Sequence, residues 1–174
     1  MPRLTDAERD VFLREPGVLL RLATIRADGA PAVTPIWFIY EDGAVWFTPR
    51  AESAWLGHLR RDPRAALAID EQPLPYRKVV IEGRAELVHD LGHDDVWRER
   101  YRRIARRYIP EAEAEAYVQN TIDQPRALFR VPLAGSTVRT WRMPVGDEDG
   151  TGIWHRRYYV PGSKMAAEAD QKKR

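Results

Sequence analysis

The chain has 174 residues and a mass of 20.1 kDa, enough for one ordinary hydrophobic core. Its 28 basic and 26 acidic residues leave a formal net charge of only +2, so composition gives no general argument for nucleic-acid binding, and we expect no such partner. The absence of cysteine excludes disulfides, thiolate chemistry and cysteine-based zinc sites. The first residues are too charged for a signal peptide, and no apolar run is long enough to span a membrane. We therefore expect a soluble cytoplasmic protein without a membrane partner.

The first third of the chain predicts a short helix followed by two β-hairpins. Thr5 is a typical N-cap for a helix that should end near Glu15. Three apolar segments follow, separated by the turn sequences Ala-Asp-Gly at 27–29 and Glu-Asp-Gly at 41–43. The middle segment, Val33–Tyr40, has apolar side chains at both alternating positions. Because a closed sheet buries only one face in its interior, the outer face of this strand must meet a helix, a ligand or a second subunit.

The remainder of the chain alternates between strand and helix patterns. An amphipathic helix is predicted over 94–108, where Trp97, Tyr101, Ile104 and Tyr108 form one aromatic stripe and arginines cover the other positions. The other predicted elements are a helix beginning at 52–53, strands over 64–70 and 78–88, a helix over 111–120, and strands over 126–133, 136–143 and 151–160.

This order of elements predicts an α+β fold, mainly antiparallel, built on a small β-barrel with peripheral helices and a helical insertion. Tight turns join the first strands, which allows antiparallel pairing, whereas parallel pairing needs long crossovers. We expect one domain over residues 1–160 and a flexible C-terminal tail over 161–174, where few side chains can be buried.

Two polar patterns have ordinary structural explanations. The arginines of the 94–108 helix resemble a phosphate-binding surface, but acidic residues lie nearby and a solvated charged face is the usual state of such helices. His89 and His93 have the i,i+4 spacing of zinc-binding pairs, but Gly92 interrupts the helical face that such a pair requires. We therefore expect no metal site.

The stretch "FTPRAESAWLGHLRRDPR", residues 47–64, is the best candidate for an anion site. A helix begins near Ser53, and Arg50 stands just before its free backbone N–H groups. Glu52 argues against an anion there, because a carboxylate competes for the positive end of the helix dipole. The residues alone leave two interpretations open, an anion site and a plain capped helix.

Taken in order, five motifs of this chain resemble the pyridoxamine 5′-phosphate oxidase-like family of flavin- and deazaflavin-binding split barrels. They are a first strand ending in Asp-Gly, the second strand "VTPIWF", the third strand "FTPR", a helix ending "LRRDPR", and the strand "VVIEGRAELV". The resemblance covers Leu19–Val88 and extends to Trp141 through "RALFRVPLAGSTVRTW". It implies a six-stranded split β-barrel of the FMN-binding type, a homodimer, and cofactors in grooves between the subunits. Family members bind FMN, the deazaflavin coenzyme factor 420 or, less often, haem.

The resemblance also implies a set of cofactor-binding residues. Lys78 matches a polar residue at the ring edge, Ser53 a hydroxyl near the phosphate, and Trp141 a tryptophan from the partner subunit. Trp55 offers a ring that can stack on a planar ligand or shield the groove. Together with Arg50 and Trp55, which the residues themselves suggest, the complete candidate set of cofactor-binding residues is Thr34, Trp37, Arg50, Ser53, Trp55, Lys78, Trp141 and Arg156.

The phosphate ligands of the family match poorly. Flavin-binding members carry basic residues on the second strand, where this chain has Thr34 and Ile39, and at the helix start, where it has Ala54 and Trp55. Each lost charge-assisted hydrogen bond to phosphate costs about 1.5–3 kcal/mol. Arg50, or the arginines at the end of the helix, would have to compensate.

These observations predict a flavin- or deazaflavin-dependent oxidoreductase that acts on a small organic substrate, with no assignable catalytic acid or base. Two alternatives remain open. One is a non-enzymatic protein that sequesters a cofactor, a haem or another planar ligand on the same barrel, and the other is a structural dimer with a vestigial groove.

Overall fold

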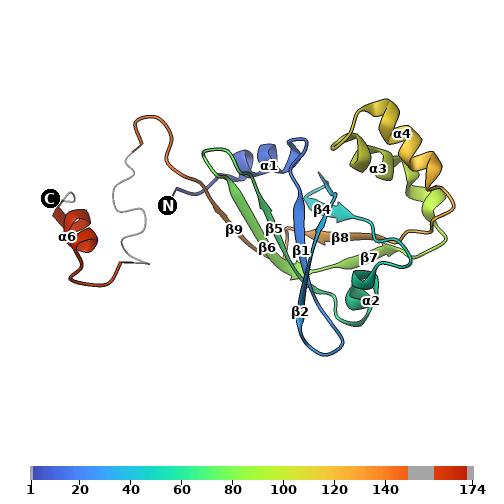
Figure 1. The fold of residues 1–174 in the computed structure, drawn as a ribbon, viewed down its shortest axis with the longest axis horizontal. Helices are drawn as coiled ribbons and strands as arrows, with labels where there is room; N and C mark the ends of the chain where they lie inside the picture. The colour runs from blue at the N-terminus through green and yellow to red at the C-terminus, as the bar shows by residue number, and fades with distance from the viewer. Residues whose placement is uncertain (1, 149–158, 172–174) are drawn as a thin grey trace.

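The computed structural model describes residues 2–148 and 159–171 and confirms an α+β fold built on antiparallel strands (Figure 1). One sheet has the strand order β2-β1-β5-β6-β9 and the other the order β3-β4-β8-β7. The strands are β1 (Leu20–Ile25), β2 (Pro31–Ile36), β3 (Ile39–Glu41), β4 (Ala44–Phe47), β5 (Arg64–Asp70), β6 (Lys78–Arg84), β7 (Glu86–His89), β8 (Leu128–Pro132) and β9 (Thr137–Trp141). The helices are α1 (Asp6–Arg14), α2 (Ala54–Arg61), α3 (Asp94–Arg106), α4 (Glu111–Asn120) and α6 (Lys164–Gln171).

Two predicted strands are each divided between the two sheets. The prediction of one continuous strand over Val33–Tyr40 is wrong, because β2 ends at Ile36 and β3 begins at Ile39 in the other sheet. The predicted strand over 78–88 likewise divides at Ala85 into β6 and β7. The apolar run continues through the first break and the alternation of apolar and charged residues continues through the second, so periodicity alone does not reveal them. The chain passes from one sheet to the other at these points, which holds the two sheets together as one barrel.

Tyr108 holds the first of these breaks in place. Its hydroxyl donates a 2.9 Å hydrogen bond to the Val18 carbonyl and accepts one of 3.1 Å from the Phe38 N–H. Burial raises the pKa of Tyr108 to about 12, so the phenol stays protonated and available for both bonds.

The main core lies between the two sheets and under α1. A capping box at Thr5 and Glu8 begins this helix as the sequence predicts. Its apolar face buries Phe12 and Leu13. The largest fully buried side chains of the described residues are Phe12, Phe38, Phe47, Phe129, Leu13, Leu20, Leu22, Leu59, Leu67, Ile69 and Ile81, together with Ile104 on α3. Each such side chain contributes about 1.5–3 kcal/mol through removal of apolar surface from water.

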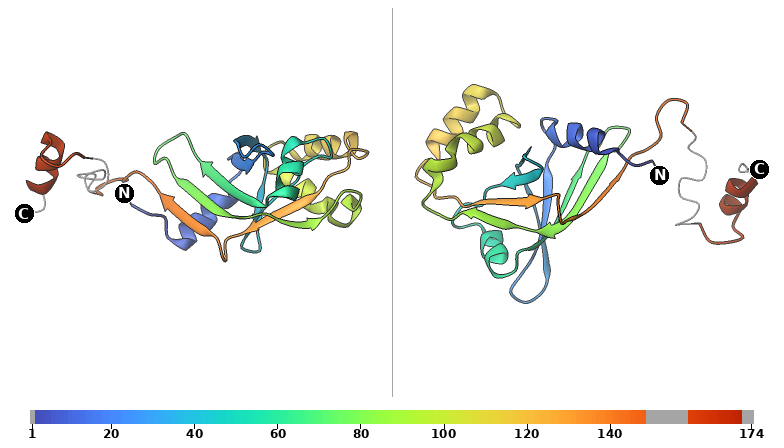
Figure 2. Two further views of the ribbon diagram at one scale, coloured as in Figure 1. Left: turned by 90° about the horizontal axis from the view of Figure 1, so that it is seen from below. Right: turned by 180° about the vertical axis from the view of Figure 1, so that it is seen from behind.

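Helices α3 and α4 form the predicted helical insertion between β7 and β8. Figures 1 and 2 show this helix pair beside the four-stranded sheet. The aromatic stripe faces inward, with Trp97 and Tyr101 buried in a second apolar cluster. Arginines on the outer face bond carboxylates; Arg103, for example, bonds both oxygens of Glu41 at 2.8 Å. These ion pairs agree with the interpretation of the arginine face as a solvated charged surface.

The segment expected to be a flexible tail contains helix α6, and its mobility stays a prediction. Most of the last predicted strand, over 151–160, lies outside the described residues, as does Arg156. None of the helices in the described ranges is long and apolar enough to cross a membrane.

Candidate functional site

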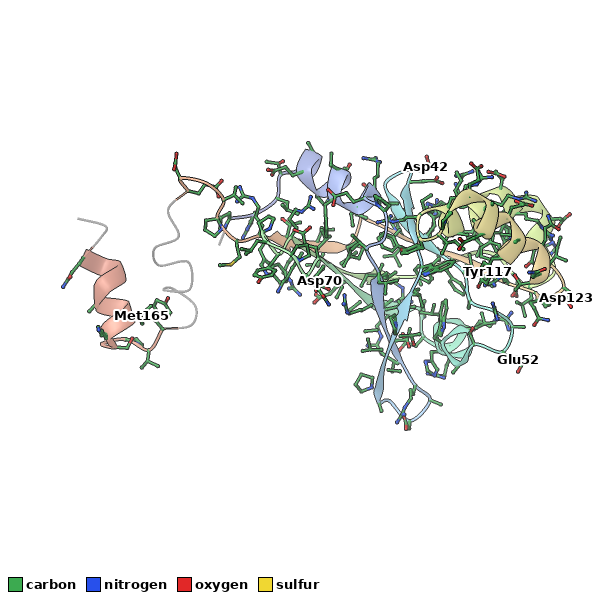
Figure 3. The ribbon with its side chains drawn as sticks, turned by 45° about the horizontal axis from the view of Figure 1, so that its top comes forward. Asp42, Glu52, Asp70, Tyr117, Asp123 and Met165 are labelled. Atoms are coloured by element: carbon green, nitrogen blue, oxygen red, sulfur yellow. The ribbon has the colours of Figure 1, made fainter. Side chains whose placement is uncertain are left out.

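The turn between β4 and α2 is fastened to the segment that precedes β8. Arg50 pairs with Arg126 in an isolated antiparallel bridge. The Ser53 hydroxyl accepts a 3.1 Å hydrogen bond from the Arg50 N–H and makes no capping bond to α2. The first turn of α2 carries no acidic side chain, and Figure 3 shows Glu52 projecting away from the molecule. The first backbone N–H groups of α2 therefore have no side-chain acceptor, an arrangement that favours an anion.

Arg50 pairs with no carboxylate among the described residues and lies at the start of α2. Its guanidinium donates a 3.0 Å hydrogen bond to the Tyr117 hydroxyl on α4, and it makes no ion pair with a described residue. Arg60, by contrast, forms an ion pair with Asp90, and Arg61 bonds a backbone carbonyl. Of the arginines expected to compensate for missing phosphate ligands, Arg50 alone lies at the start of α2 with its charge unneutralised.

We call the start of α2 and the turn before it, with Arg50 and Ser53, the corner. Tyr117 joins this corner to the helical insertion. Its hydroxyl also lies 3.4 Å from the Arg126 guanidinium, so two arginines share one phenol oxygen. Burial opposes ionisation of Tyr117, but hydrogen bonding with the Tyr101 hydroxyl, the charge of Arg126 and the hydrogen bonds from Arg50 and Arg126 outweigh it and lower the pKa of Tyr117. The corner is therefore an electropositive environment.

Aromatic rings line the same corner. Trp37 stacks on Tyr108 with ring centroids 5.0 Å apart and planes 4° apart, and it meets Tyr117 edge-on at 5.5 Å. Trp55 packs half-buried against the main core, 5.9 Å from the ring of Phe47. The structure thus accounts for Trp55 through core packing, while Trp37 lies in the ring cluster that Arg50 adjoins.

The remaining predicted residues lie elsewhere on the barrel. Lys78 pairs with Trp141 across β6 and β9, with its Nζ 5.7 Å from the indole ring. Lys78 also pairs with Asp70, and Figure 3 shows Asp70 far from Tyr117. Thr34 lies on β2 opposite Leu22. One chain therefore presents two groups of predicted residues, one at the start of α2 and one on the five-stranded sheet.

The histidines form no metal centre in the part of the chain that the structure describes, where no group of three or more histidine, aspartate or glutamate side chains converges. His89 ends β7 and His93 is the N-cap of α3, so the two do not share a helical face. His58 lies within α2, where its Nδ1 is 3.0 Å from the Thr24 hydroxyl.

With this geometry established, comparison with known proteins decides the family. Residues 5–141 match the family model described as pyridoxamine 5′-phosphate oxidase. The chain belongs to this family. A sequence search of curated proteins gives no significant match.

Solved structures of similar fold agree with membership of the pyridoxamine 5′-phosphate oxidase family. The conserved hypothetical protein Rv2991 from Mycobacterium tuberculosis is 25% identical, with a TM-score of 0.61, and the match covers 86% of this chain and 95% of that one. An F420 reductase is 22% identical, with a TM-score of 0.53 and coverages of 71% and 90%. The haem storage protein HutZ from Vibrio cholerae is 21% identical, with a TM-score of 0.57 and coverages of 79% and 96%. The split-barrel fold that the sequence predicts is thereby confirmed, although two sheets with divided strands describe it better than six strands do.

Sequence reasoning missed three residues that shape the corner in this family member, namely Tyr108, Tyr117 and Arg126. Tyr108 belongs to the predicted aromatic stripe. The stripe predicted that its side chain is buried, but it did not predict the hydrogen bonds of the Tyr108 hydroxyl with Phe38 and Val18. Tyr117 is an isolated aromatic residue in a polar helix, a weak signal of a buried contact. Arg126 follows Pro125 before an apolar strand, and no pattern in the sequence marks it as buried.

Proposed function

We propose that this chain binds a flavin-type cofactor, FMN or the deazaflavin coenzyme factor 420, and acts as an oxidoreductase on a small organic substrate. One observation carries the proposal: Arg50, without a carboxylate partner, lies beside the first turn of α2, whose N–H groups have no side-chain acceptor. A cofactor phosphate would meet both, because helix N-termini and guanidinium groups are the usual donors to phosphate.

The residues at the corner fit a phosphate with fewer cationic groups than the family resemblance implies. Ala54 and Trp55 supply only backbone N–H groups at the start of α2. Arg50 therefore has to provide the main charge–charge contact, worth about 1.5–3 kcal/mol for a hydrogen bond to a charged group. When bound, the cofactor ring supplies the hydride or electron chemistry, and the protein binds and orients it.

We also propose a homodimer. Lys78 and Trp141 lie on the five-stranded sheet, away from Arg50, so one chain does not bring all the predicted residues into one groove. The family resemblance implies that a second copy related by a two-fold axis supplies its own Trp141 to the first chain's groove, which would generate two equivalent grooves. Light scattering during size-exclusion chromatography tests this arrangement, and a monomer at micromolar concentration would contradict it.

The cofactor is tested with protein purified without any added cofactor. We expect a flavin or deazaflavin absorption band, or saturable binding at micromolar concentration when FMN or factor 420 is added, followed by reduction of the bound ring by a nicotinamide or small organic donor. A colourless protein that binds neither compound would overturn the proposal.

A non-enzymatic binding protein on the same barrel is the second candidate. The fold similarity to a haem storage protein supports it. Titration of the same protein with haem separates the two, since a tight haem complex together with no flavin binding would favour storage or sequestration.

A further inference from the structure

The guanidinium of Arg50 is held by the helical insertion rather than by the barrel. Arg50 is exposed, and among the described residues its guanidinium donates one hydrogen bond, of 3.0 Å, to the Tyr117 hydroxyl on α4. The same guanidinium lies over the Tyr117 ring, with its Cζ 6.0 Å from the ring centroid. An exposed arginine without a partner samples many rotamers, and fixing it costs side-chain entropy. Tyr117 therefore restricts Arg50 before any ligand binds.

Tyr117 is itself held by several neighbours. The guanidinium of Arg126, a residue only 6% exposed, lies 3.4 Å from the Tyr117 hydroxyl. The ring of Trp37 meets the Tyr117 ring edge-on at 5.5 Å. The Thr121 hydroxyl donates a 2.9 Å hydrogen bond to the Tyr117 backbone carbonyl. A phenol fixed in this way can hold a guanidinium in one orientation.

The backbone of Arg50 is fastened to the segment that leads out of the insertion. Arg50 and Arg126 form an isolated antiparallel bridge, and the Ala51 N–H donates a 2.9 Å hydrogen bond to the Pro125 carbonyl. Both ends of the Arg50 side chain are thus tied to the insertion, its backbone through this segment and its guanidinium through Tyr117. The orientation of Arg50 therefore depends on how the insertion docks on the barrel.

The bond to Tyr117 leaves Arg50 able to bind an anion at the same time. A guanidinium carries several N–H donors in a fixed planar fork, and this bond uses one of them. The remaining donors make no hydrogen bond to a described residue. A phosphate can therefore bind Arg50 without displacing Tyr117, so the two interactions support each other rather than compete.

We propose that Tyr117 is a positioning residue for the cofactor phosphate, which holds the Arg50 guanidinium in its binding orientation and couples cofactor binding to docking of the helical insertion. This inference rests on the proposed function, because it assigns Arg50 to a phosphate. Coupling between two equilibria is reciprocal, so a phosphate held by Arg50 also stabilises the docked insertion.

The test compares the affinities of the full-length protein for FMN and for riboflavin, which lacks the phosphate. Tyr117→Phe removes the hydroxyl and keeps the ring that contacts Trp37. We expect this variant to bind FMN about three- to tenfold more weakly and riboflavin with unchanged affinity. In an Arg50→Ala background, Tyr117→Phe should change FMN affinity by less than about twofold, because no guanidinium remains to be positioned. Factor 420 and its phosphate-free chromophore replace this pair of ligands if the protein binds only the deazaflavin.

A control and a second readout separate positioning from general loosening of the insertion. Thr121→Val removes the hydrogen bond to the Tyr117 backbone carbonyl but leaves the Tyr117 hydroxyl in place, so FMN affinity should be unchanged. Hydrogen exchange of the α4 amides reports the reciprocal effect. FMN, but not riboflavin, should slow this exchange in wild type, and the difference should disappear in Tyr117→Phe.

The outcomes distinguish this inference from the proposed function. If Arg50→Ala weakens FMN binding and a folded Tyr117→Phe protein does not, the positioning role is overturned and the phosphate site stands. Equal losses for FMN and riboflavin in Tyr117→Phe, or an undiminished effect of Tyr117→Phe in the absence of Arg50, would show a merely structural contribution and would also overturn it. Unchanged binding of the phosphorylated ligand in Arg50→Ala would overturn both the phosphate site and the positioning role.

Discussion

The Arg50 guanidinium and the Tyr117 hydroxyl are joined by a 3.0 Å hydrogen bond across 67 residues of sequence. This bond connects the turn before α2 with the helical insertion, and the Tyr117 oxygen is shared with Arg126. A neutral phenol leaves the positive charge of the guanidinium unbalanced, whereas a carboxylate would balance it. The insertion therefore positions Arg50 without neutralising it, which suits a group that has to receive an anion.

The same bond predicts an unusual tyrosine titration. Neighbouring groups lower the pKa of Tyr117, whereas burial raises that of Tyr108 to about 12 and also raises that of Tyr101. As pH increases, Tyr117 should be the first of these three phenols to ionise. Absorbance at the phenolate band, compared between wild type and Tyr117→Phe, measures this.

The Tyr117→Phe protein should lose the earliest component of the titration. Tyr76→Phe serves as the control, because Tyr76 is exposed and lies outside the ring cluster. A titration whose earliest component survives in Tyr117→Phe would contradict the electropositive character of the corner.

Replacing glycine by alanine should have opposite effects on stability at two positions, Gly83 and Gly57. A Cβ at Gly83 on β6 would lie 2.2 Å from the Ser136 Oγ and 3.3 Å from a Val131 methyl group. Ser136 donates a 2.7 Å hydrogen bond to the Pro132 carbonyl, so it cannot move without breaking that bond. We expect Gly83→Ala to lower the free energy of unfolding by about 1–3 kcal/mol, measured by urea denaturation.

Gly57 in α2 is the matched control, because a Cβ there meets no atom within 4 Å. Gly57→Ala should raise the free energy of unfolding by about 0.5–1 kcal/mol through helix propensity. Adding Ser136→Gly to Gly83→Ala removes the clashing atoms and should recover part of the loss. A Gly83→Ala protein as stable as wild type would contradict the close approach of β6 to the turn before β9.

Replacing Arg77 should lower the free energy of unfolding by an amount that depends on pH. Its guanidinium bonds Glu71 and Glu15, which fastens the end of α1 to the β5–β6 hairpin, and it stacks on Phe12 at 4.7 Å. The hydrogen bonds from Arg77 lower the pKa of Glu71 below its ordinary value of 4.5. A lowered folded-state pKa contributes stability above the unfolded-state pKa, and this contribution is lost as pH falls through the folded-state value.

We therefore expect Arg77→Met to lower the free energy of unfolding by about 2–3 kcal/mol at neutral pH. Its stability should also fall less steeply than that of wild type below roughly pH 4.5. Arg64→Met removes an exposed partner of Asp62 and should have little effect at neutral pH. Parallel pH profiles for wild type and Arg77→Met would contradict the coupling of Arg77 to Glu71.

The sequence predicts most of the elements because each has a local cause. Thr5 caps α1, Asp-Gly turns join the first strands, and the α3 stripe repeats at helical spacing. The breaks at Trp37–Phe38 and at Ala85 have no such signal, because the strand pattern of the sequence continues through them. They depend on distant partners, namely the Tyr108 hydroxyl for Phe38 and the Pro63 carbonyl for the Ala85 N–H.

The candidate site shows the same division between local and distant causes. Arg50 and Ser53 could be predicted because a helix start and an adjacent cation are neighbours in sequence. Tyr117 and Arg126 could not, since they approach Arg50 only after the insertion folds back onto the barrel. Lys78 and Trp141 came from the family resemblance alone, and the structure pairs them across β6 and β9 without connecting them to Arg50.

The measurement that tests the central claim most directly is the effect of Arg50→Ala on the affinities for FMN and riboflavin, which differ only in the phosphate. If Arg50 holds the phosphate, FMN affinity should fall by about ten- to a hundredfold, and riboflavin affinity should change little. Arg50→Lys should lose less than Arg50→Ala, and Arg60→Ala, whose side chain is paired with Asp90, should leave both affinities unchanged. Equal losses for FMN and riboflavin in Arg50→Ala would remove Arg50 from the phosphate site and contradict the account.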